Sequence, residues 1–134
     1  MRGNFRVWDN KENRYDYGDF FMTTDGELLK DVGSYSVEVW YCEHYEPGRY
    51  IAEFSTGIKD KNGEEIYGGD VHGIGDCTFE VRHGSCTDDM TLEESYGWHV
   101  YDERDGTGCN LGESEIWVNI IGNIHENPEL LERR

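Results

Sequence analysis

The stretch STGIKDKNGEEIYGGD, residues 55–70, decides the fold. It sets Asp60, Asn62 and Glu65 around Gly63, a grouping that suits either a metal-binding loop or a reversal of the chain. A calcium loop beginning at Asp60 needs glycine at its sixth position and a chelating glutamate at its twelfth. The sixth position holds Glu65, and no acidic residue stands at the twelfth. The pattern therefore favours the chain reversal over the metal loop.

The pair Asn62-Gly63 lies between Ile58 and Ile66. Such a pair is a strong signal for a tight β-hairpin, because both residues tolerate a positive φ. The pattern predicts two antiparallel strands joined at this turn. Gly69-Asp70 predicts a bend or bulge where the next strand changes sheet. We expect Ile66 and Val71 to be core residues and the local carboxylates to cap turn amides.

Length and composition predict one domain. A chain of 134 residues suits a single core. Its apolar runs are only a few residues long, too short for a membrane-spanning helix. The first residues lack the apolar stretch and cleavage site of a secretory signal, so the sequence predicts a cytoplasmic protein. The four cysteines are too sparse for a disulfide framework, and we expect free thiols.

The chain is strongly acidic. Twenty-nine Asp and Glu residues against twelve Lys and Arg residues give a formal charge of −17. The imbalance is greatest from His83 to Glu132, where twelve carboxylates accompany a single basic side chain, Arg104. This charge repels phosphate backbones and anionic membrane surfaces. We therefore expect neither direct nucleic-acid binding nor a membrane partner.

Short segments of β-branched and aromatic residues, separated by turn-forming pairs, predict many strands. The predicted strands are residues 5–8, 20–23, 36–42, 50–54, 78–82, 98–101 and 116–121. They indicate a mainly β fold with antiparallel strands. One short helix is predicted at residues 126–134, with Asn127 as its N-cap and Leu130 and Leu131 as its anchors. Residues 87–95 fit either a helix or a loop.

Three segments resemble the YopX family of small phage and prophage proteins. Residues 54–71, FSTGIKDKNGEEIYGGDV, resemble the family's TGLKDKNGKEIYEGDIV signature. Residues 5–9, FRVWD, are similar to its FRVWD start, and residues 120–131, IIGNIHENPELL, are similar to its VIGNIYENPELL ending. The three segments keep the family's order and cover about a quarter of the chain. Gly68 stands where the family usually has an acidic residue, and residues 84–115 match no motif of the family.

This resemblance implies a mainly β fold with a short C-terminal helix and an SH3-like small barrel in the C-terminal portion. It also implies a cytoplasmic, phage-related setting in a bacterial host cell and association into homo-oligomers, and it does not imply an enzyme. We treat residues 1–134 as one YopX-like domain. That domain could divide into an N-terminal β subdomain at residues 1–55 and a C-terminal β-barrel subdomain at residues 56–134.

Cysteines and histidines offer candidate zinc ligands. Cys42 lies near His44, and Cys77, His83 and Cys86 lie within ten positions of one another. Their spacings are irregular, whereas structural zinc sites draw on two closely spaced pairs. We therefore assign no metal site and no cofactor, and expect small strand residues and loop histidines instead.

Candidate catalytic groups are scattered. The possible nucleophiles and bases are Ser95, Ser114, His99 and His125. No Gly-x-Ser-x-Gly elbow surrounds either serine. The acid pairs Asp88-Asp89 and Glu93-Glu94 are neighbours in sequence, whereas two-carboxylate chemistry needs opposed groups. Asp102 and Glu113 fit the ends of a calcium loop, but Thr107 occupies its glycine position and indicates a surface loop. We assign no catalytic residue.

The sequence thus favours a non-enzymatic phage or prophage accessory protein that acts through protein–protein contacts as a homo-oligomer. Aromatic rings dominate interface energetics, and the candidate anchors are Tyr41, Tyr45, Tyr50 and Trp98. A first alternative is an acidic DNA mimic that inhibits a host nucleic-acid enzyme, for which a long, dense stripe of carboxylates is needed. Simple solubility also explains a high net charge. A metal-dependent hydrolase is the weaker alternative.

Overall fold

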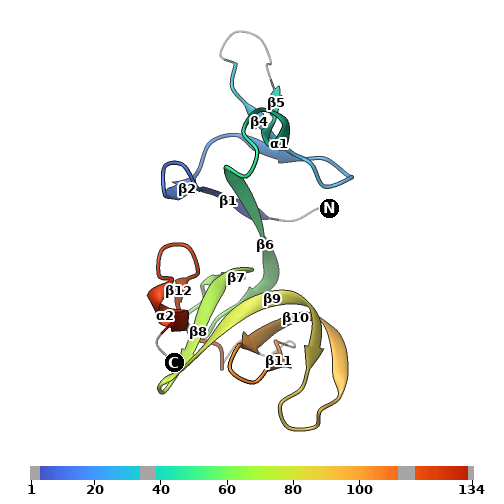
Figure 1. The fold of residues 1–134 in the computed structure, drawn as a ribbon, viewed down its shortest axis with the longest axis vertical. Helices are drawn as coiled ribbons and strands as arrows, with labels where there is room; N and C mark the ends of the chain where they lie inside the picture. The colour runs from blue at the N-terminus through green and yellow to red at the C-terminus, as the bar shows by residue number, and fades with distance from the viewer. Residues whose placement is uncertain (1–3, 34–38, 112–116, 133–134) are drawn as a thin grey trace. The chain divides into compact units, whose positions relative to one another are not determined.

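The computed structural model describes residues 4–33, 39–111 and 117–132. The named strands in these ranges pair antiparallel and the helices are short, which confirms the mainly β fold class (Figure 1). By its internal contacts the chain divides into two compact units, residues 1–54 and residues 55–134, called here the N-terminal and C-terminal units. No helix within the described ranges is long and apolar enough to cross a bilayer.

The N-terminal unit contains two small sheets. Its elements are β1 (Phe5–Asp9), β2 (Arg14–Asp16), β3 (Phe20–Met22), β4 (Leu28–Asp31), β5 (Val39–Tyr41), α1 (Cys42–Tyr45) and the first half of β6 (Tyr50–Lys59). Strand β1 pairs with β2 on one side and with β6 on the other, and Phe5 stands opposite Phe54. Strands β3, β4 and β5 form a three-stranded sheet in that order. Val7, Cys42 and Tyr50 are buried at the core of the unit.

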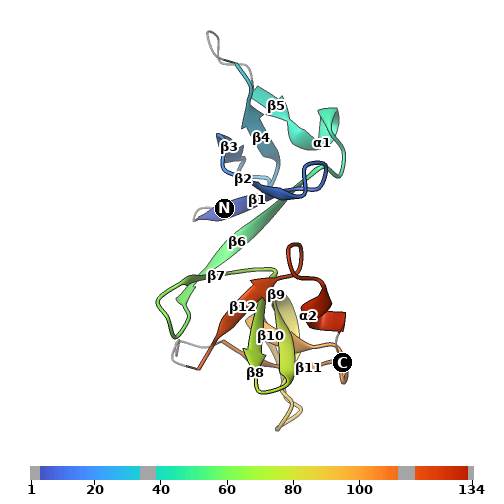
Figure 2. The ribbon, with the colours of Figure 1, turned by 90° about the vertical axis from the view of Figure 1, so that its left-hand side faces the viewer.

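The C-terminal unit is built on one larger sheet. Its elements are the second half of β6, then β7 (Glu65–Tyr67), β8 (Asp70–Ile74), β9 (Cys77–Thr87), β10 (Glu94–Asp102), β11 (Thr107–Asn110), β12 (Ile120–Asn123) and α2 (Glu129–Glu132). Five strands pair in the order β11-β10-β9-β8-β12, and the sheet curls into half of a barrel (Figure 2). The buried core residues are Ile66, Val81, Val100, Leu111 and Val118.

Asp60 forms the reversal between β6 and β7. Its buried carboxylate accepts hydrogen bonds from the N–H groups of Asn62 and Glu64, each at 2.9 Å. Gly63 has a φ of 81°, which glycine adopts without strain. The N–H of Ile120 lies 3.4 Å from the other carboxylate oxygen, so the turn also holds the chain at the start of β12. The predicted Asn62-Gly63 hairpin is confirmed, and Asp60 caps turn amides as expected.

The chain changes sheet at Gly69-Asp70, as predicted. Strand β7 pairs with β6, whereas β8 belongs to the five-stranded sheet. Gly69 has a φ of 90°, and the carboxylate of Asp70 accepts the N–H of Tyr67 at 2.8 Å. Ile66 and Val71 are fully buried on either side of this bend, so both predictions of core residues are confirmed.

The strand predicted at residues 36–42 is wrong at its C-terminal end. Residues 36–38 lie outside the described part, and β5 ends at Tyr41. Cys42 then begins α1, whose first turn closes with a hydrogen bond from the N–H of Glu46 to the Cys42 carbonyl at 2.8 Å. Burial of Cys42 in the core favours this turn over a continued strand.

The strand predicted at residues 116–121 is wrong over most of its length. Its first residue lies outside the described part, and β12 begins only at Ile120. The Val118 carbonyl accepts the N–H of Lys61 at 2.9 Å, and the Asn119 carbonyl accepts an N–H of β8 at 3.0 Å. One carbonyl accepts a hydrogen bond from the Asp60 turn and the other accepts one from β8, so residues 118 and 119 form no regular β-ladder.

The C-terminal helix is shorter than predicted. It covers Glu129–Glu132, and the last two residues of the chain lie outside the described part. Asn127 does not act as the predicted cap, because its side-chain oxygen accepts the N–H of Asn123 at 3.2 Å. Leu130 is half-buried, and its carbonyl accepts the Thr78 hydroxyl at 2.8 Å, which anchors the helix to β9.

Residues 87–95 form the tip of the β9–β10 hairpin, so the loop alternative is confirmed. Both strands extend into the segment. The carboxylate of Asp88 accepts the N–H groups of Met90 at 2.8 Å and Thr91 at 3.0 Å, and thereby closes the tip.

We predict that Asp60→Ala lowers the free energy of unfolding by about 2 kcal/mol, because buried turn amides lose their charged acceptor. Urea denaturation measures this loss. Glu64→Ala is the matched control, since it removes an exposed carboxylate from the same turn and should change stability by less than about 0.5 kcal/mol. Equal losses in the two variants would contradict the role of Asp60.

Candidate protein-interaction site

The three-stranded sheet of the N-terminal unit presents an apolar row to solvent. Its register places Phe21 opposite Leu29 and Leu29 opposite Tyr41. Residues directly opposite on neighbouring strands lie on the same face of a sheet, so the three side chains form one continuous row. Phe21 is 51% exposed and Tyr41 49% exposed. Val39 follows Tyr41 on the same face and is 37% exposed, which extends the row along β5.

The opposite face of this sheet packs against the core of the unit, and this leaves the apolar row on the solvent-facing side. Phe20 stands opposite Lys30, and Lys30 stands opposite Trp40. Phe20 packs edge-on against the buried ring of Tyr50, with ring centroids 5.3 Å apart. The Lys30 ammonium lies 4.9 Å from the centre of the Tyr50 ring. Because this face is committed to the core, the register of the sheet leaves Phe21, Leu29 and Tyr41 on the other face.

An open groove with a volume of about 880 Å³ adjoins this sheet within the N-terminal unit. Its apolar lining includes Met22, Leu28 and Phe54, and exposed Tyr41 and Tyr45 add two rings with polar ends. Large apolar surfaces with a few polar groups are typical of binding clefts, and tyrosine combines both properties in one side chain. The groove and the apolar row meet at Tyr41.

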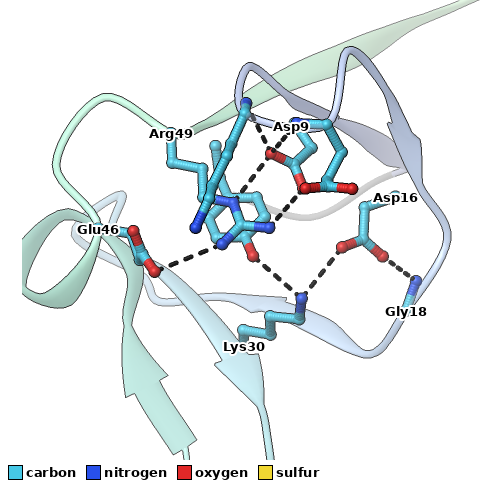
Figure 3. Close-up of polar contacts among 9 residues, drawn as sticks. Asp9, Asp16, Gly18, Lys30, Glu46 and Arg49 are labelled. Atoms are coloured by element: carbon cyan, nitrogen blue, oxygen red, sulfur yellow. Dashed lines mark hydrogen bonds and ion pairs between the residues drawn. The ribbon is translucent and has the colours of Figure 1, made fainter.

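Tyr50 lines the groove and is held by polar contacts. The ammonium of Lys30 donates to the Tyr50 hydroxyl at 3.1 Å and to Asp16 at 3.0 Å, and Asp16 in turn accepts the N–H of Gly18 at 2.8 Å (Figure 3). The Arg49 guanidinium lies 4.8 Å from the centre of the Tyr50 ring. The Lys30 ammonium binds the hydroxyl of Tyr50 and the Arg49 guanidinium lies against its ring, so these contacts hold the ring in the wall of the groove.

A buried ion pair between Asp9 and Arg49 supports this arrangement. Arg49 donates from Nε to Asp9 Oδ1 and from Nη2 to Asp9 Oδ2, each at 2.9 Å, a bidentate geometry that strengthens the pair (Figure 3). Asp9 Oδ1 also accepts the N–H groups of Lys11 at 2.9 Å and Glu12 at 3.2 Å. The hydrogen bonds from Arg49, then those from the backbone, hold the pKa of Asp9 at about 2 against the opposing effect of burial.

Two of the four predicted aromatic anchors are confirmed as exposed, and two are wrong. Tyr41 and Tyr45 are 49% and 59% exposed. Tyr50 is buried, because Phe20 and Lys30 pack onto it. Trp98 is half-buried in the C-terminal unit, where it packs against that core.

Sequence reasoning missed Phe21 and Leu29 as interaction residues. The signal was available in the turn at Asp25-Gly26: a hairpin closed there pairs Phe21 with Leu29 and places both on one face. Strand pairing between Leu29 and Tyr41, across residues outside the described part, could not be read from the sequence.

The candidate zinc ligands do not converge in the described residues. Cys42 is buried and its pKa is raised by burial, whereas His44 is exposed and packs against Tyr45. On β9, His83 and Cys86 are three residues apart in a regular ladder and therefore lie on opposite faces. Within the described ranges, no group of three His, Cys, Asp or Glu side chains is placed to hold a metal ion.

The candidate catalytic groups are likewise separate. The Ser95 hydroxyl accepts the Asn110 amide at 2.8 Å, and His99 contacts the Gly97 carbonyl at 3.0 Å. Ser95 and His99 are four positions apart on β10, about 13 Å along an extended strand. His125 lies in the turn after β12. Ser114 lies outside the described residues.

In the second candidate calcium loop, Asp102 lies at the end of β10 and pairs with Arg104. The Arg104 guanidinium donates to the Asp102 carboxylate at 2.9 Å and 3.1 Å. Residues 103–106 form an exposed turn between β10 and β11, which is the predicted surface loop. Glu113 lies outside the described residues.

The molecule is thus a small β protein with an apolar row and a groove on its N-terminal unit. The family model for the YopX protein matches residues 4–132, and the chain belongs to the YopX family. The resemblance seen in the three sequence segments is confirmed.

Two solved structures are similar to the chain along nearly its whole length. The crystal structure of protein EF1440 from Enterococcus faecalis has 25% identity and a TM-score of 0.51, with 98% of this chain and 99% of that chain covered. The crystal structure of protein yopX from Bacillus subtilis has 19% identity and a TM-score of 0.54, with 98% and 97% covered. No curated protein matches. Neither structure's name states an activity or a ligand.

We predict that the Asp9–Arg49 pair makes the N-terminal unit sensitive to acid. An aspartate whose native pKa is about 2, against 3.8 ordinarily, contributes its stability fully above pH 3.8 and loses it as the pH falls toward 2. The stability lost on protonation of Asp9 amounts to about 2 kcal/mol. Urea denaturation of the wild type and of Asp9→Asn over this pH range measures it.

The Asp9→Asn variant should lose stability less steeply with falling pH than the wild type. The matched control is Asp19→Asn, which alters an exposed carboxylate of the same unit and should keep the wild-type slope. A wild-type slope in Asp9→Asn would show that the ion pair does not set the acid sensitivity.

Proposed function

We propose that this YopX-family protein is a non-enzymatic accessory protein of a phage or prophage that acts through protein–protein contacts as a homo-oligomer. The observation that carries the proposal is the exposed apolar row of Phe21, Leu29 and Tyr41 beside the groove. Three neighbouring apolar side chains on one solvent-facing sheet are unusual in a monomer and typical of a contact surface. The cytoplasmic, phage-related setting rests on the family resemblance.

The chemistry of the row suits self-association. Phe21, Leu29 and Tyr41 carry no charge, so two copies can bring these rows together without opposing like charges at the centre. Elsewhere the surface is strongly acidic, with a formal charge of −17 per chain. Repulsion between copies is therefore smallest where the apolar rows meet, and charge depletion at the core of an interface is the usual pattern. Aromatic anchors such as Phe21 and Tyr41 then supply most of the contact energy.

We predict that the double variant Phe21→Ser with Tyr41→Ser shifts the protein from oligomer to monomer. Loss of two central rings should weaken association by about 2 kcal/mol or more. Size-exclusion chromatography with multi-angle light scattering measures the mass at several concentrations.

The control for this experiment is Tyr17→Ser, which removes an equally large ring that is 87% exposed and lies outside the row. It should leave the oligomer intact. A monomeric wild type, or a double variant that keeps the wild-type mass, would refute the proposed interface. Thermal denaturation of each variant separates loss of association from loss of fold.

A second candidate function is the acidic DNA mimic, which the distribution of exposed carboxylates favours. The exposed acids of the β9–β10 and β10–β11 turns include Asp89, Glu93, Glu94, Glu103 and Asp105. Two basic side chains near them, Arg82 and Arg104, already pair with Glu80 and Glu103 and with Asp102. The turns therefore present mostly uncompensated negative charge, as the basic groove of a DNA-binding enzyme requires.

If this second function holds, the protein should elute host proteins from DNA–cellulose, and the elution should weaken steeply as salt is added. A variant with Glu93→Gln, Glu94→Gln and Asp105→Asn should lose this activity. The Phe21→Ser with Tyr41→Ser variant keeps every carboxylate and should retain it. Equal elution by the neutralised variant would exclude mimicry by these turns.

A further inference from the structure

A second, smaller cavity lies entirely within the C-terminal unit and is independent of the contact surface described above. Its volume is about 140 Å³, and its walls include Phe79, Val100 and Trp117. A cavity of about 150 Å³ holds a group the size of benzene. The cavity is thus sized for one side chain or one small planar group.

Three rings meet at one wall of this cavity. The His72 ring stacks on Phe79 with centroids 5.7 Å apart and an interplanar angle of 28°, and it meets Trp117 edge-on with centroids 5.4 Å apart. Aromatic rings attract a cation placed against their faces, and a planar guanidinium also stacks on them. The wall therefore favours a flat, cationic group over a neutral aliphatic one.

His72 is only 2% exposed, and its environment keeps it uncharged. Burial lowers the pKa of the ring below its usual value, so it carries no positive charge at neutral pH that would repel a cation. Asn119 offers Nδ1 of the ring both an N–H at 2.9 Å and a carbonyl at 3.3 Å. The Asn119 N–H donates to Nδ1, so Nδ1 is an acceptor and the ring carries its proton on Nε2.

Carboxylates give the cavity its charge. Asp89 and Asp102 both line it. Asp102 is neutralised by Arg104, with 2.9 Å between Oδ2 and Nη2. The carboxylate of Asp89, by contrast, has no ion-pair or hydrogen-bond partner among the described residues, and the backbone bond from its N–H to the Gly108 carbonyl at 3.2 Å fixes its position. The net charge at the cavity is therefore negative.

We propose that this cavity binds an arginine side chain from a basic segment of a partner protein. The guanidinium stacks against the aromatic wall formed by Phe79, His72 and Trp117 and pairs with the carboxylate of Asp89. The acidic charge of the unit, with eighteen Asp and Glu residues against six Lys and Arg residues in residues 55–134, attracts such a segment.

The test uses two capped tripeptides, acetyl-Gly-Arg-Gly-amide and acetyl-Gly-citrulline-Gly-amide, titrated into the full-length ¹⁵N-labelled protein. Citrulline has the shape of arginine without its charge. The arginine peptide should produce saturable shifts of the Trp117 indole N–H, assigned with Trp117→Phe, and of the His72 ring nitrogens. The citrulline peptide should bind several-fold more weakly. Equal binding of both peptides, or no saturable shift at Trp117, would overturn the proposal.

Two variants test whether the peptide binds in this cavity. Asp89→Asn should lower the affinity for the arginine peptide roughly threefold, the effect expected from loss of one exposed ion pair. Its matched control is Glu93→Gln, which removes an exposed carboxylate of the same hairpin that does not line the cavity and should leave the affinity unchanged. An equal loss in both variants would indicate a diffuse attraction to the acidic surface and would refute the cavity. The self-association test is unaffected by either result, because both substitutions leave the N-terminal unit intact.

Discussion

The carboxylate of Asp60 is the constraint on which the C-terminal unit depends. It accepts hydrogen bonds from two N–H groups of a tight turn and from a third N–H at Ile120, sixty positions further along the chain. Each contact gives the buried carboxylate a hydrogen-bond donor, and a buried carboxylate without donors would be costly in a protein interior. The same carboxylate thereby fixes the register of β6 with β7 and the start of β12. The N-terminal unit uses an equivalent device, since Asp9 closes the turn after β1 and holds Arg49.

These buried acids explain how an acidic chain can fold into small units. Each unit has a core of only a few apolar residues, so burial of apolar surface alone contributes little stability. Asp9 and Asp60 are almost fully buried and accept several hydrogen bonds each. The hydrogen bonds from Arg49 and the backbone lower the pKa of Asp9 to about 2, so this buried carboxylate remains ionised at neutral pH. Other acidic residues, such as Asp89 and Glu93, lie on the surface, where they contribute charge without entering the core.

Sequence reasoning recovered the fold class, the Asn62-Gly63 hairpin and the change of sheet at Gly69-Asp70, because each depends on local backbone geometry. It failed where distant contacts override local preference. Val118 and Asn119 look like strand residues, yet their carbonyls bind the Asp60 turn and β8. The sequence predicts Tyr50 to be an exposed anchor, yet Lys30 and Phe20 pack against its ring and it is buried in the core. The apolar row was found only in part, since it depends on the pairing of β4 with β5.

The boundary between the two units falls within strand β6, and this has a consequence for recombination between related genes. Its first half pairs with β1 and its second half with β7, and the units meet along the chain between Phe54 and Ser55. Each unit is thus encoded by one uninterrupted run of codons. A single recombination event at that boundary would exchange a complete core between related genes, so the apolar row and the acidic turns can evolve as separate, transferable traits.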